Sequence, residues 1–280
     1  MKKFNIFVLL LVMCGMLTAC GSAAEKLEKQ QALKAEGMEL QMSGDYSGAI
    51  AKYEEALRLS DMKVGAEEVD LAYYKASAQY QSGDLTGAID TYSAILAVKE
   101  SEDSYLGRGL LYVAAKDAKK AEDDLNKVLL ETEDPLIRGI IYNVVHQTDK
   151  AKEYFEKAKK EGNTEAIFYL ASLYDKEGDH NYAMILLEEY IASGNAGAEG
   201  YLSVAGHYFE MEAYEDALSM LQGGIALGDS AVLKQLFREE VACYEKLGDF
   251  ASAKKCAGAY LEKYPDDEIM QKEYEFLKSR

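Results

Sequence analysis

The sequence predicts an all-α protein: an α-solenoid, coiled as a right-handed superhelix, of about seven helix–turn–helix repeats with a C-terminal capping helix. The first observation behind this prediction is a short motif that recurs at steps of 30 to 39 residues, a period typical of stacked helical units. The second is that the chain has two prolines in 280 residues, which leaves helices almost uninterrupted. The third is a hydrophobic content of 49% beside 29% charged residues, which supplies a core and argues against disorder.

The chain begins with the features of a targeting signal. Lys2 and Lys3 are followed by an apolar run of thirteen residues, 4–16, which is short for a membrane span. The next residues, Leu17-Thr18-Ala19-Cys20, resemble the lipobox of bacterial lipoproteins. The resemblance implies that residues 1–19 are a signal peptide cleaved before Cys20. It also implies that Cys20 carries lipid, with 20–29 as the lipidated N-terminus and a short tether.

The predicted mature chain is acidic and anchored to a membrane. The net charge of −18 becomes −20 when Lys2 and Lys3 are removed with the signal, and such a charge argues against binding to nucleic acid. Two acyl chains give stable anchoring, so we expect the protein on the extracytoplasmic side of the cell membrane. Ser22, in place of an aspartate, would permit the outer membrane in a Gram-negative host. The sequence does not decide between the two envelope types.

The recurring motif is a turn followed by an alanine. Gly-Asp stands at this turn in 44–45, 83–84 and 248–249, where glycine ends one helix in the left-handed conformation and aspartate begins the next. The alanine recurs at Ala49, Ala88, Ala121, Ala151, Ala183, Ala217 and Ala253. A tyrosine stands nine residues before five of these alanines, at Tyr112, Tyr142, Tyr174, Tyr208 and Tyr244.

This pattern resembles the tetratricopeptide repeat, a unit of two helices and 34 residues. With the alanine numbered as position 20, the tyrosine falls at position 11 and is expected in the core. Small residues stand at position 8, namely Gly37, Ala76, Gly109, Gly139, Ala171 and Ala205, with Val241 as the exception. Large residues stand at position 24, namely Tyr53, Tyr92, Leu125, Phe155, Leu187 and Leu221, with Ala257 as the exception. Small residues at 8 and 20 allow the two helices of a repeat to approach closely.

The repeats also depart from the family pattern. The chain has no Trp for position 4, and the proline of position 32 survives only as Pro265. Residues 162–166 and 194–198 resemble the joints of the related Sel1-like repeats, so the repeat count stays open between six and eight. The resemblance to a bacterial tetratricopeptide or Sel1-like lipoprotein covers about 30–265, and the polar segment 266–280 is predicted to be a C-terminal capping helix. The predicted helices span 24–42, 46–60, 67–82, 85–98, 102–115, 118–131, 135–146, 148–160, 164–177, 180–193, 197–211, 214–227, 231–247, 250–263 and 266–278.

In this family the first helix of each repeat lines a concave surface, through positions 2, 5, 9, 12 and 13. The resemblance therefore implies a partner-binding groove made of Tyr73, Tyr80, Leu106, Leu110, Val113, Leu136, Ile140, Phe168, Leu202 and Phe209. Position 2 is acidic in five successive repeats and predicts an acidic rim of Asp70, Asp103, Glu133, Glu165 and Glu199. A contiguous apolar patch usually marks an interface. The predicted partner is another protein of the cell envelope, which presents a segment with an apolar face and basic flanks.

These surface residues have other interpretations. Acidic residues at position 2 fall near helix starts, where they favour the helix dipole whether or not a partner binds. Tight superhelical closure, a dimer or the terminal segments of the chain could equally cover the apolar positions. The 21 tyrosines would also suit stacking against sugars, although most of them fall at packing positions.

Catalysis and metal binding have no motif here. The sequence contains no Walker loop, Gly-x-Ser-x-Gly, His-Glu-x-x-His or Cys-x-x-Cys, and the doublets Asp123-Asp124 and Glu239-Glu240 are expected to be solvated. The histidines, at 146, 180 and 207, are expected to stand apart from one another. We therefore expect no enzyme activity, no cofactor and no metal.

Three further residues bear on ligand and redox chemistry. The family's clamp for C-terminal carboxylates needs several basic residues, and Lys34 is the only early match, so this ligand is not expected. Cys243 and Cys256 could form a disulfide in an extracytoplasmic compartment, although two separate small thiols are the favoured interpretation.

The sequence thus predicts a membrane-anchored bacterial lipoprotein that acts as a scaffold or adaptor for protein–protein interaction. Two alternatives stay open: a surface lipoprotein that binds a glycan or peptide, and a structural homo-oligomer. The identity of the partner and the biological process are not decided by the sequence.

Overall fold

The computed structural model describes residues 24–60, 64–228 and 230–280, and the regular secondary structure within these ranges is entirely α-helical. The predicted signal peptide, 1–19, and the predicted lipidation site, Cys20, lie outside the described residues. The first described helix spans 24–42, so the second part of the predicted tether is already helical. No helix in the described ranges combines the length and hydrophobicity needed to cross a bilayer.

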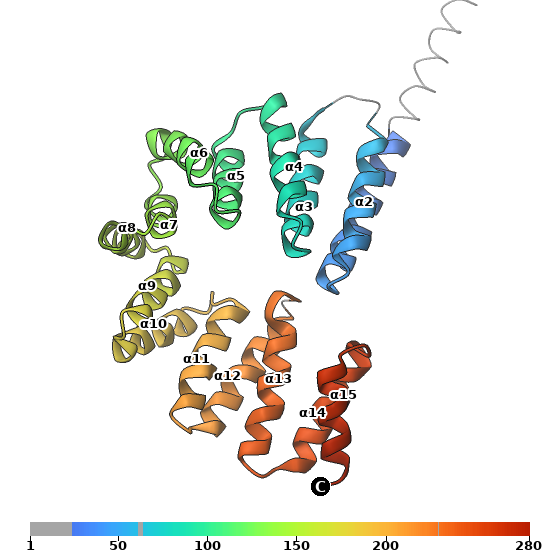
Figure 1. Cartoon of the computed structure of the whole chain (residues 1–280), viewed down its shortest axis with the longest axis vertical. Helices are drawn as coiled ribbons and strands as arrows, with labels where there is room; N and C mark the ends of the chain where they lie inside the picture. Colours follow the sequence, from blue (N-terminus) through green and yellow to red (C-terminus); the bar gives the residue numbers. More distant parts are fainter. Residues whose placement is uncertain (1–23, 61–63, 229) are drawn as a thin grey trace, which may run out of the picture. The chain divides into compact units, whose positions relative to one another are not determined.

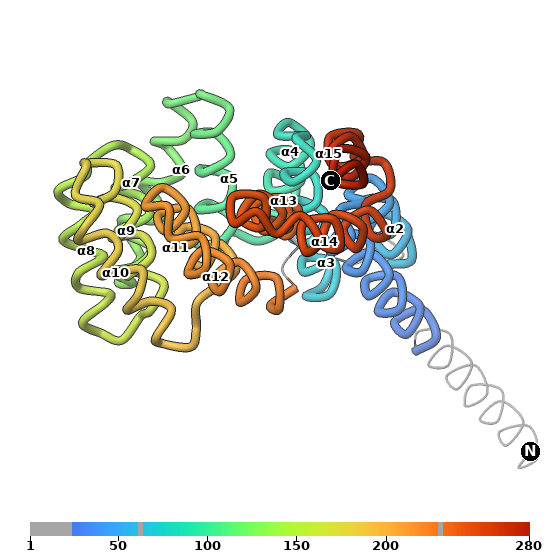
Figure 2. The backbone as a smooth tube through the Cα atoms, turned by 90° about the horizontal axis from the view of Figure 1, so that it is seen from below, coloured from blue at the N-terminus to red at the C-terminus, as the bar shows by residue number. Residues whose placement is uncertain are grey.

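The described residues form two compact units, unit 1 before Thr132 and unit 2 from Thr132 onward. Unit 1 contains the helix 24–42, α2 (Tyr46–Arg58), α3 (Ala66–Gln81), α4 (Leu85–Val98), α5 (Glu102–Ala114) and α6 (Ala118–Glu131). Unit 2 contains α7 (Pro135–Val144), α8 (Thr148–Lys160), α9 (Glu165–Lys176), α10 (His180–Ala192), α11 (Ala198–Glu210), α12 (Tyr214–Leu227), α13 (Ser230–Lys246), α14 (Phe250–Lys263) and α15 (Glu268–Lys278). Within each unit, consecutive helices pack side by side, as the two views show (Figures 1 and 2).

The predicted all-α solenoid of helix pairs is confirmed, and the predicted helix ends lie within two residues of the observed ones. The seven alanines of position 20 are between 0% and 3% exposed. A Cβ added to Gly37, Gly109 or Gly139 would lie 2.5, 2.8 and 2.5 Å, respectively, from the position-24 side chain of the same repeat. The close approach between the two helices, which the small residues predict, is therefore present in these three repeats.

The turn inside each repeat is built by backbone geometry. Asp45, Asp84 and Asp249 each begin a helix by accepting a hydrogen bond from the backbone N–H three residues ahead, at 2.9 to 3.0 Å. All seven repeats place a left-handed residue five positions before the alanine, at Gly44, Gly83, Lys116, His146, Gly178, Glu212 and Gly248. His146 therefore belongs to a turn, at a φ of 60°, a conformation that non-glycine residues seldom adopt.

The tyrosines of position 11 are half-buried, so the prediction that they belong to the core is wrong in part. Their rings lie against the helix pairs, as for Tyr142, whose ring stacks on Tyr154 with centroids 5.3 Å apart. Two of their hydroxyls have polar partners: Tyr208 donates to Glu188 at 3.3 Å, and Tyr244 accepts from Gln222 at 3.2 Å. A phenol accepts this mixed position because its ring is apolar and its O–H needs a partner.

The C-terminal helix α15 caps unit 2. Met270 and Leu277 are 3% and 1% exposed and pack in one cluster with Ala257 and Tyr260 of α14. The outer face of this cap is mostly charged, but it also carries two exposed apolar side chains, Ile269 and Phe276.

Candidate partner-binding surface

The predicted groove residues divide between the two units. In unit 1, α3 carries Tyr73 and Tyr80, and α5 carries Leu106, Leu110 and Val113. Tyr80 is 55% exposed, and the other four are half-buried. Tyr80 and Leu110 line one hollow of about 290 Å³ between these two helices. The structure therefore brings these two predicted residues together.

Tyr73 has a structural use that the sequence did not indicate. Its hydroxyl lies 2.6 Å from Ser104 Oγ and 3.2 Å from Ser101 Oγ at the start of α5. Its ring meets Tyr92 edge-on, with centroids 5.8 Å apart. This side chain joins α3, α4 and α5, and it offers a partner only part of its surface.

In unit 2, the predicted groove residues pack against the core with part of each side chain. Leu136 and Ile140 of α7 and Phe168 of α9 contact the cluster formed by α8, α9 and α10. Leu202 and Phe209 of α11 contact the next cluster, built around Ala217 and Leu221 of α12. All five are half-buried, so packing uses one side of each residue and leaves another side accessible.

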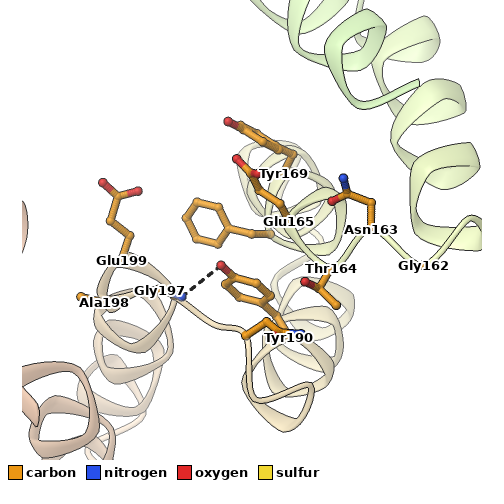
Figure 3. Close-up of a pocket in the computed structure, with 12 residues that line it drawn as sticks. Gly162, Asn163, Thr164, Glu165, Tyr169, Tyr190, Gly197, Ala198 and Glu199 are labelled. Carbon is orange, nitrogen blue, oxygen red and sulfur yellow. Dashed lines mark hydrogen bonds between the residues drawn. The ribbon is translucent and has the colours of Figure 1, made fainter. Parts of the chain in front are cut away.

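A hollow of unit 2 lies between the start of α9 and the start of α11, with a volume of about 640 Å³. It contains three residues predicted for the groove or its rim, Glu165, Phe168 and Glu199, together with Tyr169 and Tyr190. Figure 3 shows Glu165 and Tyr169 on one side, Glu199 on the other, and Tyr190 below them in this view. The Tyr190 hydroxyl accepts a hydrogen bond from the backbone N–H of Gly197 at 3.1 Å.

The five rim carboxylates are not equivalent. Asp70 forms an ion pair with Lys34 of the first helix, whose pKa is raised chiefly by this hydrogen bond. Lys34 is therefore already engaged in an ion pair. Glu133 precedes α7, whereas Asp103, Glu165 and Glu199 lie in the first turns of their helices. A favourable interaction with the helix dipole thus accounts for Asp103, Glu165 and Glu199 but not for Asp70 or Glu133.

The hollow of unit 2 affects the acidity of Tyr169. Burial is the main cause that raises the pKa of this phenol to about 12, and the charges of Glu165 and Glu199 add to it. Glu165 has the larger effect of the two on the pKa of this phenol. The charges of both carboxylates therefore act on the Tyr169 hydroxyl.

Two histidines expected to stand apart lie together in unit 2. Asp175 Oδ1 at the end of α9 is 2.7 Å from His180 Nδ1 and 3.5 Å from His207 Nε2. The ring centroids of the two histidines are 6.2 Å apart. The expectation of isolated histidines is wrong for this pair. In the described part of the chain, however, no group of three or more His, Cys, Asp or Glu residues is placed to hold a metal ion.

Two carboxylates expected to be solvated are buried. Asp124 is 3% exposed and Glu240 is 7% exposed. Arg108 of α5 donates to Asp124 of α6 through Nε at 2.7 Å and through a terminal nitrogen at 2.9 Å, and it also donates to Ser93 of α4 at 3.1 Å. This arginine therefore joins three helices of unit 1.

The thiols of Cys243 on α13 and Cys256 on α14 are both free, the first buried and the second half-buried. Burial raises the pKa of each thiol to about 11. This state agrees with the favoured interpretation of two separate thiols.

Two segments of the chain match the family described as the tetratricopeptide repeat: residues 34–104 in unit 1 and residues 242–267 in unit 2. The chain thus contains tetratricopeptide repeats in both units. This repeat is typical of scaffolds for protein–protein interaction rather than of enzymes. A comparison with curated proteins finds no match.

Several solved structures resemble the chain in fold. A tetratricopeptide repeat protein from Parabacteroides merdae is 17% identical, with a TM-score of 0.50 over 90% of this chain and 99% of that one. PilW, a type IV pilus biogenesis factor, is 15% identical, with a TM-score of 0.52 over 74% of this chain and 99% of that one. Yeast Tom70 is 14% identical, with a TM-score of 0.51 over 85% of this chain and 59% of that one. These similarities show the fold alone.

Proposed function

We propose that this protein is a membrane-anchored bacterial lipoprotein that acts as a scaffold or adaptor in the cell envelope. The observation that carries the proposal is the tetratricopeptide repeat in both units, with half-exposed apolar side chains on successive first helices. A lipid on Cys20 would confine the repeats to a membrane surface. Confinement raises the effective concentration of a bound partner, so the work of such a protein is to position another one.

The partner that fits best is a protein segment with an apolar face and basic flanks. Leu110 and Tyr80 in unit 1 offer apolar contact, and the rim carboxylates offer contact for basic residues. A segment held as a helix or an extended peptide can use both.

The alternative function, uptake of a glycan or peptide by a surface lipoprotein, has one observation in its favour. The hollow of about 640 Å³ in unit 2 has polar and aromatic walls, as a site for a small ligand would require. Screening the chain from residue 21 onward against oligosaccharides tests this alternative directly. Light scattering on the same chain tests the homo-oligomer, because a monomer alone would remove it.

Affinity capture from a membrane extract tests the scaffold. The baits are the chain from residue 21 onward and two variants of it, Leu110→Asp and Phe168→Asp. Ile185→Asp is the matched control, since Ile185 is 58% exposed on a second helix, outside the predicted groove. A specific partner should be lost with either groove variant and kept with the control. Equal capture by all four baits would exclude the groove as the binding surface.

The membrane anchor is tested independently of the partner. Cells that express the whole chain should incorporate labelled palmitate into the protein, and Cys20→Ser should abolish both the label and the partition into detergent. Label that persists in the serine variant would remove Cys20 as the lipidation site.

A further inference from the structure

We infer that the hollow between α9 and α11 receives an arginine side chain from the partner protein. This inference rests on the proposed scaffold function and names the chemistry of one contact. The hollow offers aromatic walls and carboxylates that lack a basic counterpart.

The aromatic wall consists of three rings in contact. Phe168 lies with its centroid 6.3 Å from that of Tyr169 and 5.6 Å from that of Tyr190. The face of an aromatic ring attracts a cation, and a guanidinium stacks on it as a flat group. A half-buried Phe168 therefore gives an arginine both an apolar surface and a favourable electrostatic contact.

This wall is held in place before any partner binds. Tyr169 stacks on the fully buried Phe155, with centroids 5.0 Å apart and planes 6° from parallel. Tyr190 is 8% exposed, and its hydroxyl is fixed by the backbone of Gly197. A rigid site binds with a smaller loss of conformational freedom.

The hollow carries negative charge, and no basic side chain lines it. Its lining includes Glu165 and Glu199 but no lysine, arginine or histidine, and neither glutamate takes part in an ion pair within the described residues of unit 2. Other glutamates of the unit have such partners: Glu177 pairs with Lys152, and Glu189 pairs with Lys159. The hollow therefore holds two carboxylates with no basic side chain in its lining to pair with them.

Anions and metal ions fit this hollow less well. An anion would be attracted by the first turns of α9 and α11, but the two glutamates lie in those turns and repel it. A metal ion would need more than these two carboxylates, and the volume of about 640 Å³ exceeds that of an ion. An arginine with its flanking backbone suits both the size and the charge. It can pair through two parallel hydrogen bonds with one carboxylate while its plane stacks on a ring.

The test is a titration followed by nuclear magnetic resonance of the tyrosine rings, with Tyr169→Phe and Tyr190→Phe to assign the signals. The probes are N-acetyl-arginine-methylamide and its neutral counterpart N-acetyl-citrulline-methylamide, which has nearly the same shape. The arginine probe should shift the Tyr169 signal with saturation in the millimolar range, and the citrulline probe should not. Added salt should weaken the binding, because it screens partly exposed charges.

Glu165→Gln and Glu199→Gln should each weaken binding of the arginine probe about threefold to fivefold, the range for a partly exposed ion pair. Glu215→Gln is the matched control, since Glu215 is exposed in the first turn of α12 and is absent from the lining of the hollow. Circular dichroism should show equal helicity in all three variants. Equal binding of both probes, no response to arginine, or binding that is insensitive to the two glutamine variants would each overturn the inference.

The capture experiment separates this inference from the scaffold function. A partner lost with Leu110→Asp but retained at wild-type level by the double variant Glu165→Gln, Glu199→Gln would support the scaffold and refute the arginine site. Loss with both would support both. A response of Tyr169 to an oligosaccharide without a response to arginine would refute the site and favour the alternative function.

Discussion

The contact between Gly139 and Phe155 offers a quantitative test of the repeat packing. A Cβ added to Gly139 would lie 2.5 Å from two carbon atoms of the Phe155 ring. Ordinary contacts between carbon atoms are about 3.5 to 4.0 Å, so the ring would have to retreat by about 1 Å. It has little room to do so, because Phe155 is 0% exposed and stacks on Tyr169.

The expected magnitude follows from two opposing terms. Excess volume in a packed core costs about 1 to 3 kcal/mol, whereas alanine in place of glycine inside a helix gains about 1 kcal/mol. Gly206 in α11 is the matched control, since an added Cβ there meets nothing within 4 Å. Gly206→Ala should therefore show only the gain in helix propensity. Gly139→Ala should therefore be about 1 to 3 kcal/mol less stable than Gly206→Ala, because the propensity term cancels between the two variants.

The assay is urea denaturation of the chain from residue 21 onward, followed by circular dichroism. Stacked repeats can unfold in stages, so hydrogen exchange of α7 and α8 accompanies it and reports the stability of the affected pair. Phe155→Leu in the Gly139→Ala background should restore part of the loss by making room, a coupling that a double-mutant cycle measures. A Gly139→Ala variant that unfolds at or above the midpoint of Gly206→Ala would refute the tight contact.

Three further predictions concern charge and protonation. Arg108→Met should destabilise unit 1 by about 3 kcal/mol in urea denaturation, because it leaves a buried Asp124 carboxylate unpaired; a stability equal to wild type would contradict this. Burial and the neighbouring Glu273 raise the pKa of Glu245 from its usual 4.5 to about 7. This group therefore binds its proton more tightly in the folded state, and its contribution to stability is complete below pH 4.5 and is lost as the pH rises to about 7. Glu245→Gln should therefore reduce the change in thermal midpoint between pH 4.5 and about pH 7. A change with pH equal to that of the wild type would contradict this assignment. Cys243, with its thiol pKa raised to about 11 by burial, should react slowly with iodoacetamide at neutral pH and rapidly in urea; equal rates would show that the thiol is accessible.

The helix positions and the internal contacts of each repeat were predictable because they depend on short spacings. The alanine of position 20 fixes the register, and the small residue of position 8 then has to face the large one of position 24. Gly109 and Leu125 obey this rule, with a closest approach of 2.8 Å for an added Cβ. The same register places Arg108 beside Asp124, one position earlier on each helix. The buried ion pair therefore has a signal in the sequence, which lies in the repeat register and not in the local charge of the acidic doublet.

Contacts between successive repeats were not predictable in the same way. His180 and His207 are 27 residues apart, and both lie beside Asp175, with each of the three residues on a different helix. Their meeting depends on how one helix pair rotates against the next, and no short spacing determines that rotation. The shapes of the hollows depend on the same rotation, so the sequence could name candidate residues but not the cavities they line.

The groove residues also show why a position in a repeat does not define a binding residue. Tyr73 uses its hydroxyl on Ser104, and Leu136 lies against the core, so packing between repeats takes part of each side chain. The hollow of unit 2 differs because small residues stand where the next repeat begins. A Cβ on Gly200 would lie 2.6 Å from the Tyr190 ring, and Gly197 supplies the backbone N–H that holds the hydroxyl of that ring. The glycines of this joint thus keep the ring in its place and leave space beside it, which is how a degenerate repeat can leave a hollow between neighbouring repeats.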